Sequence, residues 1–136
     1  MANIVLISCI SKKLDHSAKA KDMYTSSLFK YSLKYAQKLN SDKIFILPAK
    51  YHLLYLDTGI GPYNVTLNKM PVKERKLWAE EIIRELSENA DLENDKFIIL
   101  AGENYAKFIR DKLKHVEEPL KGLSIGNRLN FLKSKS

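Results

Sequence analysis

The chain has 136 residues, of which 45% are hydrophobic and 29% are charged. This length and balance are typical of one globular domain with its own core, and they exclude a disordered chain. No apolar run reaches the roughly 20 residues that a membrane-spanning helix requires, so no membrane partner is expected.

The N-terminal stretch and the single cysteine indicate the cellular compartment of the protein. The N-terminal stretch MANIVLISCIS lacks a basic region before its apolar residues, so we interpret it as a first strand rather than a signal peptide. The lone Cys9 has no internal partner for a disulfide, which agrees with a reducing environment. A cytoplasmic location is therefore expected.

The net charge of +7 is unevenly placed along the chain. Residues 1–68 hold nine Lys and four Asp, whereas residues 69–136 hold 14 basic and 12 acidic residues. A basic field of this kind attracts polyanions such as nucleic acid. The alternative is a Lys-rich proteome that biases every surface in the same way.

The first half of the chain predicts a strand, a helix and a second strand. Residues 3–9 form a continuous apolar run, as in a strand buried on both faces. After a polar segment, helical spacing begins at Ser26 or Ser27, either of which is a good N-cap. The apolar face of this helix carries Leu28, Tyr31, Tyr35 and Leu39. The second strand is predicted at residues 43–48.

The second half continues the alternation. A helix is predicted from Pro71, a residue suited to the first turn. Its apolar face recurs at four-residue steps, with Trp78, Ile82 and Leu86. Residues 96–102 form a third buried strand that opens directly into a helix over residues 103–113. The end of the chain predicts a short fourth strand, a turn and a last amphipathic helix that carries Ile125, Leu129 and Leu132.

These elements predict a single α/β domain over residues 1–136, with about four mostly parallel strands and helices on both faces of the sheet. In such open sheets ligands bind outside the carboxyl ends of the strands, where the strand order changes direction. The segments that leave the first three strands begin at Ser8, Pro48 and Gly102. We expect them to converge on one edge and to wall one polar cleft.

The connection over residues 47–70 is long, aromatic and without a clear pattern. Connections beyond roughly 12 to 15 residues are usually functional or disordered, and exposing this many Tyr, Leu and Ile side chains would be costly. We interpret the connection as a lid or wall over the carboxyl edge. Its rings at Tyr51, Tyr55 and Tyr63 either stack on a planar base or cap the core.

The segment SCISKKLD directly follows the first strand and is a candidate anion site. Ser8, Cys9, Lys12 and Lys13 together could hold a phosphate or a carboxylate. The segment lacks the glycines of a P-loop, and the alternative is a solvated basic loop. Cys9 is a weaker candidate for a nucleophile, since a Cys at the end of a buried strand is more often a packing residue.

The histidines His16, His52 and His115 lie too far apart in sequence for a metal motif, so neither a metal nor a cofactor is expected. His52 falls in the predicted pocket segment, where it could act as a general acid or base.

The third strand ends at Gly102, which permits a close approach of the backbone to a ligand at the start of the next helix. Glu103 and Asn104 lie in the first turn, where they could simply complement the helix dipole. The functional alternative is that Asn104 or Tyr105 contacts the ligand.

Several motifs together resemble, in order and over nearly the whole chain, a family of small bacterial and phage proteins catalogued as a domain of unknown function. The segments that carry the resemblance are SCISKK, AKAKDMYTSSLF, LPAKYHLL, GPYNVTLNKM, WAEEI, ILAGENY and PLKGLSIGNRLNFL. The family patterns include a Tyr-x-Ser-x-x-Phe segment, an Ala-Lys-Tyr-Gly-Leu-Leu stretch, a Pro-Tyr-Asp-x-Thr-Leu stretch and a Leu-Ala-Gly-x-x-Tyr turn. The matching positions are Cys9, Lys12 or Lys13, Tyr24, Phe29, Ala49, Lys50, Tyr51, Leu53, Leu54, Pro62, Tyr63, Thr66, Leu67, Ala101, Gly102 and Tyr105.

Two positions depart from these patterns. His52 stands where Gly is usual, and Asn64 stands where Asp is common. An Asn still forms hydrogen bonds but cannot transfer a proton as a carboxylate does, so a binding role is retained better than an acid–base role.

The middle segment is also similar to the peroxide-stress YaaA family, whose members are associated with DNA binding. Four-stranded α/β folds of this size resemble the uracil-DNA-glycosylase-like architecture as well, by topology alone. These resemblances imply a nucleic acid or its bases as the ligand.

The function predicted from the sequence is the binding of a nucleotide or nucleic-acid base, with an enzymatic action on the base or its N-glycosidic bond. The candidate catalytic residues are Asn64, His52 and Asn104. The candidate ligand-binding residues are Ser8, Cys9, Lys12, Lys13, Tyr24, Lys50, Tyr51, Tyr63, Gly102 and Tyr105. Two alternatives remain, a non-catalytic DNA-binding stress protein and a hydrolase or transferase of a small phosphorylated metabolite. An oligomer is possible, but nothing in the sequence indicates one.

Overall fold

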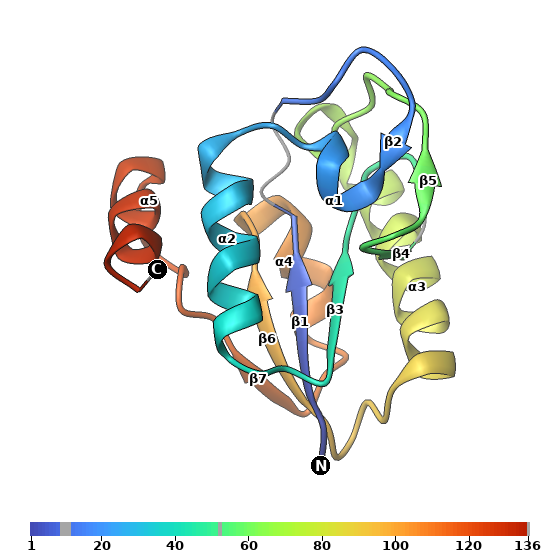
Figure 1. The fold of residues 1–136 in the computed structure, drawn as a ribbon. Helices are drawn as coiled ribbons and strands as arrows, with labels where there is room; N and C mark the ends of the chain where they lie inside the picture. Colours follow the sequence, from blue (N-terminus) through green and yellow to red (C-terminus); the bar gives the residue numbers. More distant parts are fainter. Residues whose placement is uncertain (9–11, 52, 136) are drawn as a thin grey trace.

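A computed structural model of the chain describes residues 1–8, 12–51 and 53–135 (Figure 1). The strands are β1 (Asn3–Ile7), β2 (Ala18–Lys19), β3 (Lys43–Ile46), β4 (Leu54–Tyr55), β5 (Gly59–Ile60), β6 (Lys96–Leu100) and β7 (His115–Glu117). The helices are α1 (Ala20–Met23), α2 (Ser27–Lys38), the 3₁₀ turn η1 (Leu67–Lys69), α3 (Val72–Asn89), α4 (Glu103–Arg110) and α5 (Ile125–Ser134).

The main sheet has five strands in the order β4-β3-β1-β6-β7. β1 pairs in parallel with both β3 and β6, and β6 pairs in parallel with β7, while the two-residue β4 runs antiparallel on β3. The predicted α/β fold with mostly parallel strands is therefore confirmed. β1 lies at the centre, and its apolar run is fully buried because both of its faces are covered.

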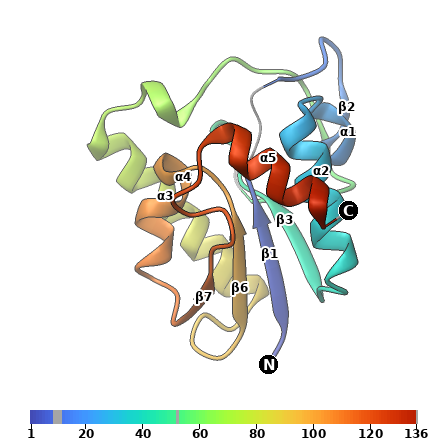
Figure 2. The same ribbon diagram turned by 90° about the vertical axis from the view of Figure 1, so that its left-hand side faces the viewer.

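Helices cover both faces of the sheet, and Figure 2 shows α3 and α4 on one side of the strands and α2 on the other. α3 packs against α4 on one face, and α2 packs against α5 on the other. The predicted core face of α3 is confirmed, since Trp78, Ile82 and Leu86 are buried. Among the residues described, no helix has the length and apolar character needed to cross a membrane.

The residues that α2 buries most completely lie beside its predicted apolar stripe. The helix buries Phe29, Ser32 and Ala36, whereas the predicted stripe of Leu28, Tyr31 and Tyr35 is half-buried. The reason is that this stripe faces α5 and not the sheet, as the ring contact between Tyr35 and Phe131 shows, with centroids 5.8 Å apart.

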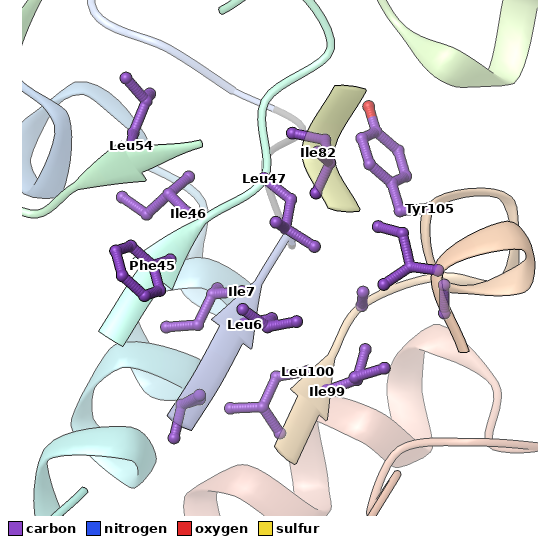
Figure 3. Close-up of a cluster of buried hydrophobic side chains, with 14 of the residues drawn as sticks. Leu6, Ile7, Phe45, Ile46, Leu47, Leu54, Ile82, Ile99, Leu100 and Tyr105 are labelled. Carbon is purple, nitrogen blue, oxygen red and sulfur yellow. The ribbon is translucent and has the colours of Figure 1, made fainter. Parts of the chain in front are cut away.

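One part of the core lies between the central strands and α3 (Figure 3), and another part includes Phe29 and Ala36 of α2 on the opposite face. Figure 3 shows side chains from β1, β3 and β6 together with Ile82 of α3 and Tyr105 of α4. Each large apolar side chain that is fully buried here contributes about 1.5–3 kcal/mol, so this cluster supplies much of the driving force for folding.

The long connection contains more regular structure than the sequence predicts. It forms β4, β5 and η1, and the polar segment after β1 forms β2 and α1. β2 pairs antiparallel with β5, with Ala18 opposite Ile60. The two connections that follow β1 and β3 thus support one another above the sheet (Figure 1). Sequence periodicity could not reveal two-residue strands, because so short a run carries no pattern.

Candidate ligand-binding cleft

β1 and β6 end side by side, and the residues that follow them open a cleft. Ser8 follows β1 and donates its backbone N–H to Leu100 O at 3.0 Å, and Gly102 follows β6 by two residues. The chain passes from β1 to β3 on one side and later to β6 on the other, so this junction is the switch point of the sheet. A cleft of about 690 Å³ lies there, which we call the Ser8–Gly102 cleft.

The walls of the cleft combine hydroxyl groups, two cations and an apolar patch. The hydroxyl groups belong to Ser8, Thr25, Ser26, Ser27 and Thr66. The cations are Lys12 and Arg128, and the apolar patch is formed by Leu28, Ile125 and Leu129. This mixture is typical of a site for a ligand that has one polar, anionic end and one apolar part.

Three helices present their N-terminal ends to the cleft. α2 contributes Ser27, α4 contributes Glu103 and Asn104, and α5 contributes Ile125. The first N–H groups of a helix have no partner within it and carry the positive end of its dipole, so they attract an anion. The N-cap of α4 is Gly102, which has no side chain to cap the helix. The N–H of Tyr105 donates to Gly102 O at 3.1 Å, whereas the N–H groups of Glu103 and Asn104 have no hydrogen-bond partner among the described residues.

The Ser8 hydroxyl is the sharpest indication of a ligand. Its residue is only 5% exposed, and Ser8 Oγ has no hydrogen-bond partner within the described part of the chain. Buried hydroxyl groups are nearly always paired, because an unpaired one costs about 1–3 kcal/mol. Since Ser8 lines the cleft, a ligand atom there would supply the missing partner.

Arg128 brings a guanidinium group to the start of α4. Its Nε donates to Leu123 O at 3.0 Å, which fixes the side chain. A Cβ atom built on Gly102 would lie 3.6 Å from Arg128 Nη1, so the guanidinium covers this N-cap directly. Because Arg128 forms no ion pair among the residues described, its terminal nitrogens remain free to bind a ligand.

Glu103 is the acidic residue on the cleft wall, and it is already paired. Arg110 donates to its two carboxylate oxygens at 2.7 and 3.1 Å. This hydrogen bonding from Arg110 lowers the pKa of Glu103, so the carboxyl stays ionised with its charge balanced. Within the described ranges, the cleft-lining charges that have no ion-pair partner are therefore those of Lys12 and Arg128, which favours an anionic ligand.

The predicted catalytic residue Asn104 lies on the cleft wall, and both ends of its amide are engaged in hydrogen bonds to other residues. Its Nδ2 donates to Asn68 Oδ1 at 2.7 Å, and its Oδ1 accepts from Arg75 Nη1 at 3.2 Å. Arg75 also donates through Nε to the carbonyls of Leu67 and Met70, each at 3.0 Å. Asn104 therefore positions the η1 segment.

Tyr105 lines the same cleft but is 8% exposed. Its hydroxyl accepts from the backbone N–H of Leu67 at 3.5 Å, and its ring packs edge-on against Trp78 with centroids 5.7 Å apart. It therefore supports the floor of the cleft and anchors η1 to α4.

The segment at Pro48 does not line the cleft, although it leaves the same sheet edge. Pro48 is buried, and its carbonyl accepts from Trp78 Nε1 at 2.9 Å. Lys50 is exposed, with its Nζ 5.5 Å from the centroid of Tyr51. The part of the long connection that reaches the cleft is its later portion, through Thr66 and Asn68.

The other tyrosines among the predicted ligand-binding residues, Tyr24, Tyr51 and Tyr63, form a separate cluster. Tyr24 Oη and Tyr63 Oη are 2.8 Å apart, and both residues are buried. Tyr51 packs edge-on against Tyr63 at 5.5 Å, and its hydroxyl donates to Gly61 O. Lys13 Nζ lies 4.5 Å from the Tyr63 centroid, and burial lowers the pKa of this lysine. For Tyr63 to stack on a base, as predicted, Lys13 would have to leave this ring face.

Asn64 lies on this second side as well. It is exposed and lines a smaller pocket of about 300 Å³ together with Lys13, Asp15 and Tyr63. The structure therefore places eight of the predicted site residues at two separate pockets, while Tyr24, Lys50 and Tyr51 line neither. Ser8, Lys12, Gly102, Asn104 and Tyr105 line the Ser8–Gly102 cleft, and Lys13, Tyr63 and Asn64 line the smaller pocket.

Cys9 and His52, two of the predicted site residues, lie outside the described residues. Of the other histidines, His16 is exposed and pairs with Asp15 at 2.9 Å, and His115 is exposed on β7. No group of three potential metal ligands occurs in the part of the chain that the structure describes.

The buried tyrosine pair predicts a loss of stability at alkaline pH. Burial raises the pKa of Tyr24 to about 12, and burial also raises the pKa of Tyr63. In the unfolded chain a tyrosine titrates near pH 10, so the folded state retains the proton that the unfolded state has released. The stabilisation is complete below about pH 10 and is lost as the pH rises toward about 12.

Denaturant unfolding at half-unit steps between pH 9 and 12 measures this effect. The free energy of unfolding is expected to fall by about 1.4 kcal/mol per pH unit for each retained proton. Tyr24→Phe should reduce the slope, whereas Tyr55→Phe at the exposed sheet edge is the matched control and should not. An unchanged slope in Tyr24→Phe would contradict the prediction.

The sequence alone did not identify Arg128 or the N-terminus of α2 as parts of the cleft. Ser26 and Ser27 predict the start of a helix, but an N-cap pattern does not predict which residues of other elements lie beside that helix end. Arg128 sits within the segment PLKGLSIGNRLNFL, which supported the family resemblance, and that resemblance was the one signal that could have singled it out.

Neither the curated proteins nor the solved structures compared with the chain gave a match. One family matches over residues 4–134, which is nearly the whole chain. The expectation of an uncharacterised family is thus confirmed, and the chain belongs to the Family of unknown function (DUF6884).

Proposed function

We propose that the protein binds a nucleotide in the Ser8–Gly102 cleft, with the phosphate at the start of α4 and the base against the apolar wall. The observation that carries this proposal is the buried hydroxyl of Ser8, which has no partner among the described residues and lies beside a helix N-terminus whose N-cap is Gly102. A cytoplasmic setting is part of the proposal, since nucleotides are abundant there.

The phosphate end of the cleft contains the required donors. Ser8 Oγ can donate one hydrogen bond, Arg128 can donate two through its terminal nitrogens, and the first N–H groups of α4 supply the dipole. Lys12 at the rim adds a second positive charge. These groups act together because each favours the same charge on the ligand.

The other end of the cleft suits a planar, weakly polar group. Leu28 and Leu129 are half-buried on its wall, and Ile125 is 70% exposed. An exposed Ile beside a cluster of phosphate-binding donors is explained if a base covers it. The volume of about 690 Å³ also lies within the range of small-molecule sites, about 300–1,000 Å³.

Recognition is better supported than a reaction at the N-glycosidic bond. Such a reaction needs an acid or base beside the bond. The amide of Asn104 is engaged by Asn68 and Arg75, and the carboxylate of Glu103 is held by Arg110.

Ser8→Ala tests the proposal because it should affect binding and stability in opposite directions. Removing a buried hydroxyl that has no partner in the described part of the chain is expected to raise the free energy of unfolding by about 1 kcal/mol. The same change should weaken the binding of nucleoside 5′-monophosphates by about 10- to 100-fold, since one hydrogen bond to a charged phosphate is lost.

The measurement is a thermal-shift titration with nucleoside 5′-monophosphates, the matching nucleosides and inorganic phosphate. Monophosphates are expected to raise Tm more than nucleosides do. Ser87→Ala, at an exposed hydroxyl of α3, is the matched control and should behave as the wild type. The proposal is wrong if nucleosides and monophosphates shift Tm equally, or if Ser8→Ala binds as the wild type does.

A further inference from the structure

α2 and α5 carry basic residues without any acidic ones. The basic residues on α2 are Lys30, Lys34 and Lys38, and those on α5 and the residue after it are Arg128, Lys133 and Lys135. α3 on the opposite face of the sheet, by contrast, mixes both signs, as its pairs between Arg84 and both Glu81 and Glu88 show. A general excess of Lys does not explain this difference, because it would act on both faces of the molecule.

Aromatic rings lie between these positive charges. Lys34 Nζ and Lys133 Nζ each lie 5.7 Å from the centroid of Tyr31. Phe131 packs against Tyr35, and Lys135 Nζ lies 5.6 Å from the Phe131 ring. The rings are half-buried and the lysines are exposed. We define the α2–α5 face as Lys30, Tyr31, Lys34, Phe131, Lys133 and Lys135.

The α2–α5 face is continuous with the Ser8–Gly102 cleft. A groove of about 430 Å³ runs beside α2, lined among others by Lys21, Lys30 and Lys34. Ser27 lines both this groove and the cleft. From Ser27 to Lys34 the helix rises roughly 10 Å, so a chain that leaves the cleft at Ser27 meets these lysines in succession.

We propose that the α2–α5 face binds the sugar–phosphate backbone of a single-stranded nucleic acid, one nucleotide of which occupies the cleft. The assignment of that nucleotide rests on the proposed function. A single strand fits because a base in the cleft must be unstacked, and because basic grooves with interleaved rings are the usual platform for unpaired strands. DNA and RNA share this backbone chemistry, and separate probes distinguish them.

Fluorescence anisotropy with labelled 12-nucleotide DNA, RNA and duplex DNA tests the proposal. The variant Lys30→Gln/Lys34→Gln/Lys133→Gln is expected to bind one of the single strands about 10-fold or more weakly than the wild type at moderate salt. The slope of log affinity against log salt should decrease by about 2, since three phosphate contacts are removed. Lys73→Gln/Lys112→Gln/Lys114→Gln removes the same charge from exposed positions elsewhere and should change affinity less than 2-fold.

The outcomes separate this proposal from the proposed function. The α2–α5 variant should retain the Tm shift caused by nucleoside monophosphates, whereas Ser8→Ala should lose much of it. An equal loss of strand affinity in both triple variants would refute binding at the α2–α5 face, because it would show that the net charge of the protein alone determines the affinity. Duplex binding as tight as single-strand binding would overturn the single-strand assignment. A missing monophosphate response would reject the proposed function, while the α2–α5 face would still be judged by the strand measurements.

Discussion

Replacing Arg128 with Met is expected to weaken the binding of nucleoside monophosphates by about 10- to 100-fold while the protein stays folded. Hydrogen bonds to a charged group contribute about 1.5–3 kcal/mol each, and this side chain offers its terminal nitrogens at the N-cap of α4. Met retains much of the aliphatic volume that packs on the chain, so little stability should be lost. Isothermal titration calorimetry of both proteins, together with denaturant unfolding, measures the two quantities.

Arg84→Met is the matched control for Arg128→Met. It removes a guanidinium group from the exposed surface of α3, where Arg84 pairs with Glu81 and Glu88. Arg128→Lys should recover only part of the affinity, because a lysine keeps the charge but cannot form the paired hydrogen bonds of a guanidinium group. Wild-type affinity in Arg128→Met would show that the phosphate does not lie at the start of α4.

Replacing Tyr63 with Ala is expected to lower the free energy of unfolding by about 3–5 kcal/mol, the usual cost of truncating a buried aromatic residue. Tyr63 is 7% exposed and contacts the rings of both Tyr24 and Tyr51. Because it does not line the Ser8–Gly102 cleft, the folded fraction should retain its affinity for nucleotides. Denaturant unfolding with a ligand titration on the folded protein measures both effects.

Tyr63→Phe separates packing from hydrogen bonding. It keeps the ring and leaves the Tyr24 hydroxyl without its partner at 2.8 Å, at an expected cost of about 1–3 kcal/mol. In Tyr24→Phe/Tyr63→Phe the cost should be smaller than the sum of the single changes, since neither hydroxyl then remains unpaired. A loss of nucleotide affinity in Tyr63→Phe with unchanged stability would instead place Tyr63 in the ligand site, as the sequence predicts.

The position of the cleft followed from local patterns. Apolar runs at β1 and β6 predicted buried parallel strands, and the rule for open sheets then predicted that Ser8 and Gly102 would meet. The strands and helices around them were predictable because side-chain periodicity and end signals are properties of neighbouring residues. The prediction that the segment at Pro48 would also line the cleft was wrong. The carbonyl of Pro48 accepts a hydrogen bond from Trp78, and such a tertiary contact leaves no pattern in the local sequence.

The amino-acid sequence by itself determined the class of the fold, the order of its main elements and the edge at which two strand ends meet. The reason is that the spacing of apolar residues along the chain reflects both secondary structure and burial. Only the tertiary structure decided which side chains face one another there. Arg128 stands over Gly102, Asn104 joins Asn68 and Arg75, and Tyr24 pairs with Tyr63, each across many residues of chain. Those contacts depend on how whole helices and connections pack against one another. Packing is decided by the three-dimensional fit of side-chain shapes and volumes, which the order of polar and apolar residues does not specify.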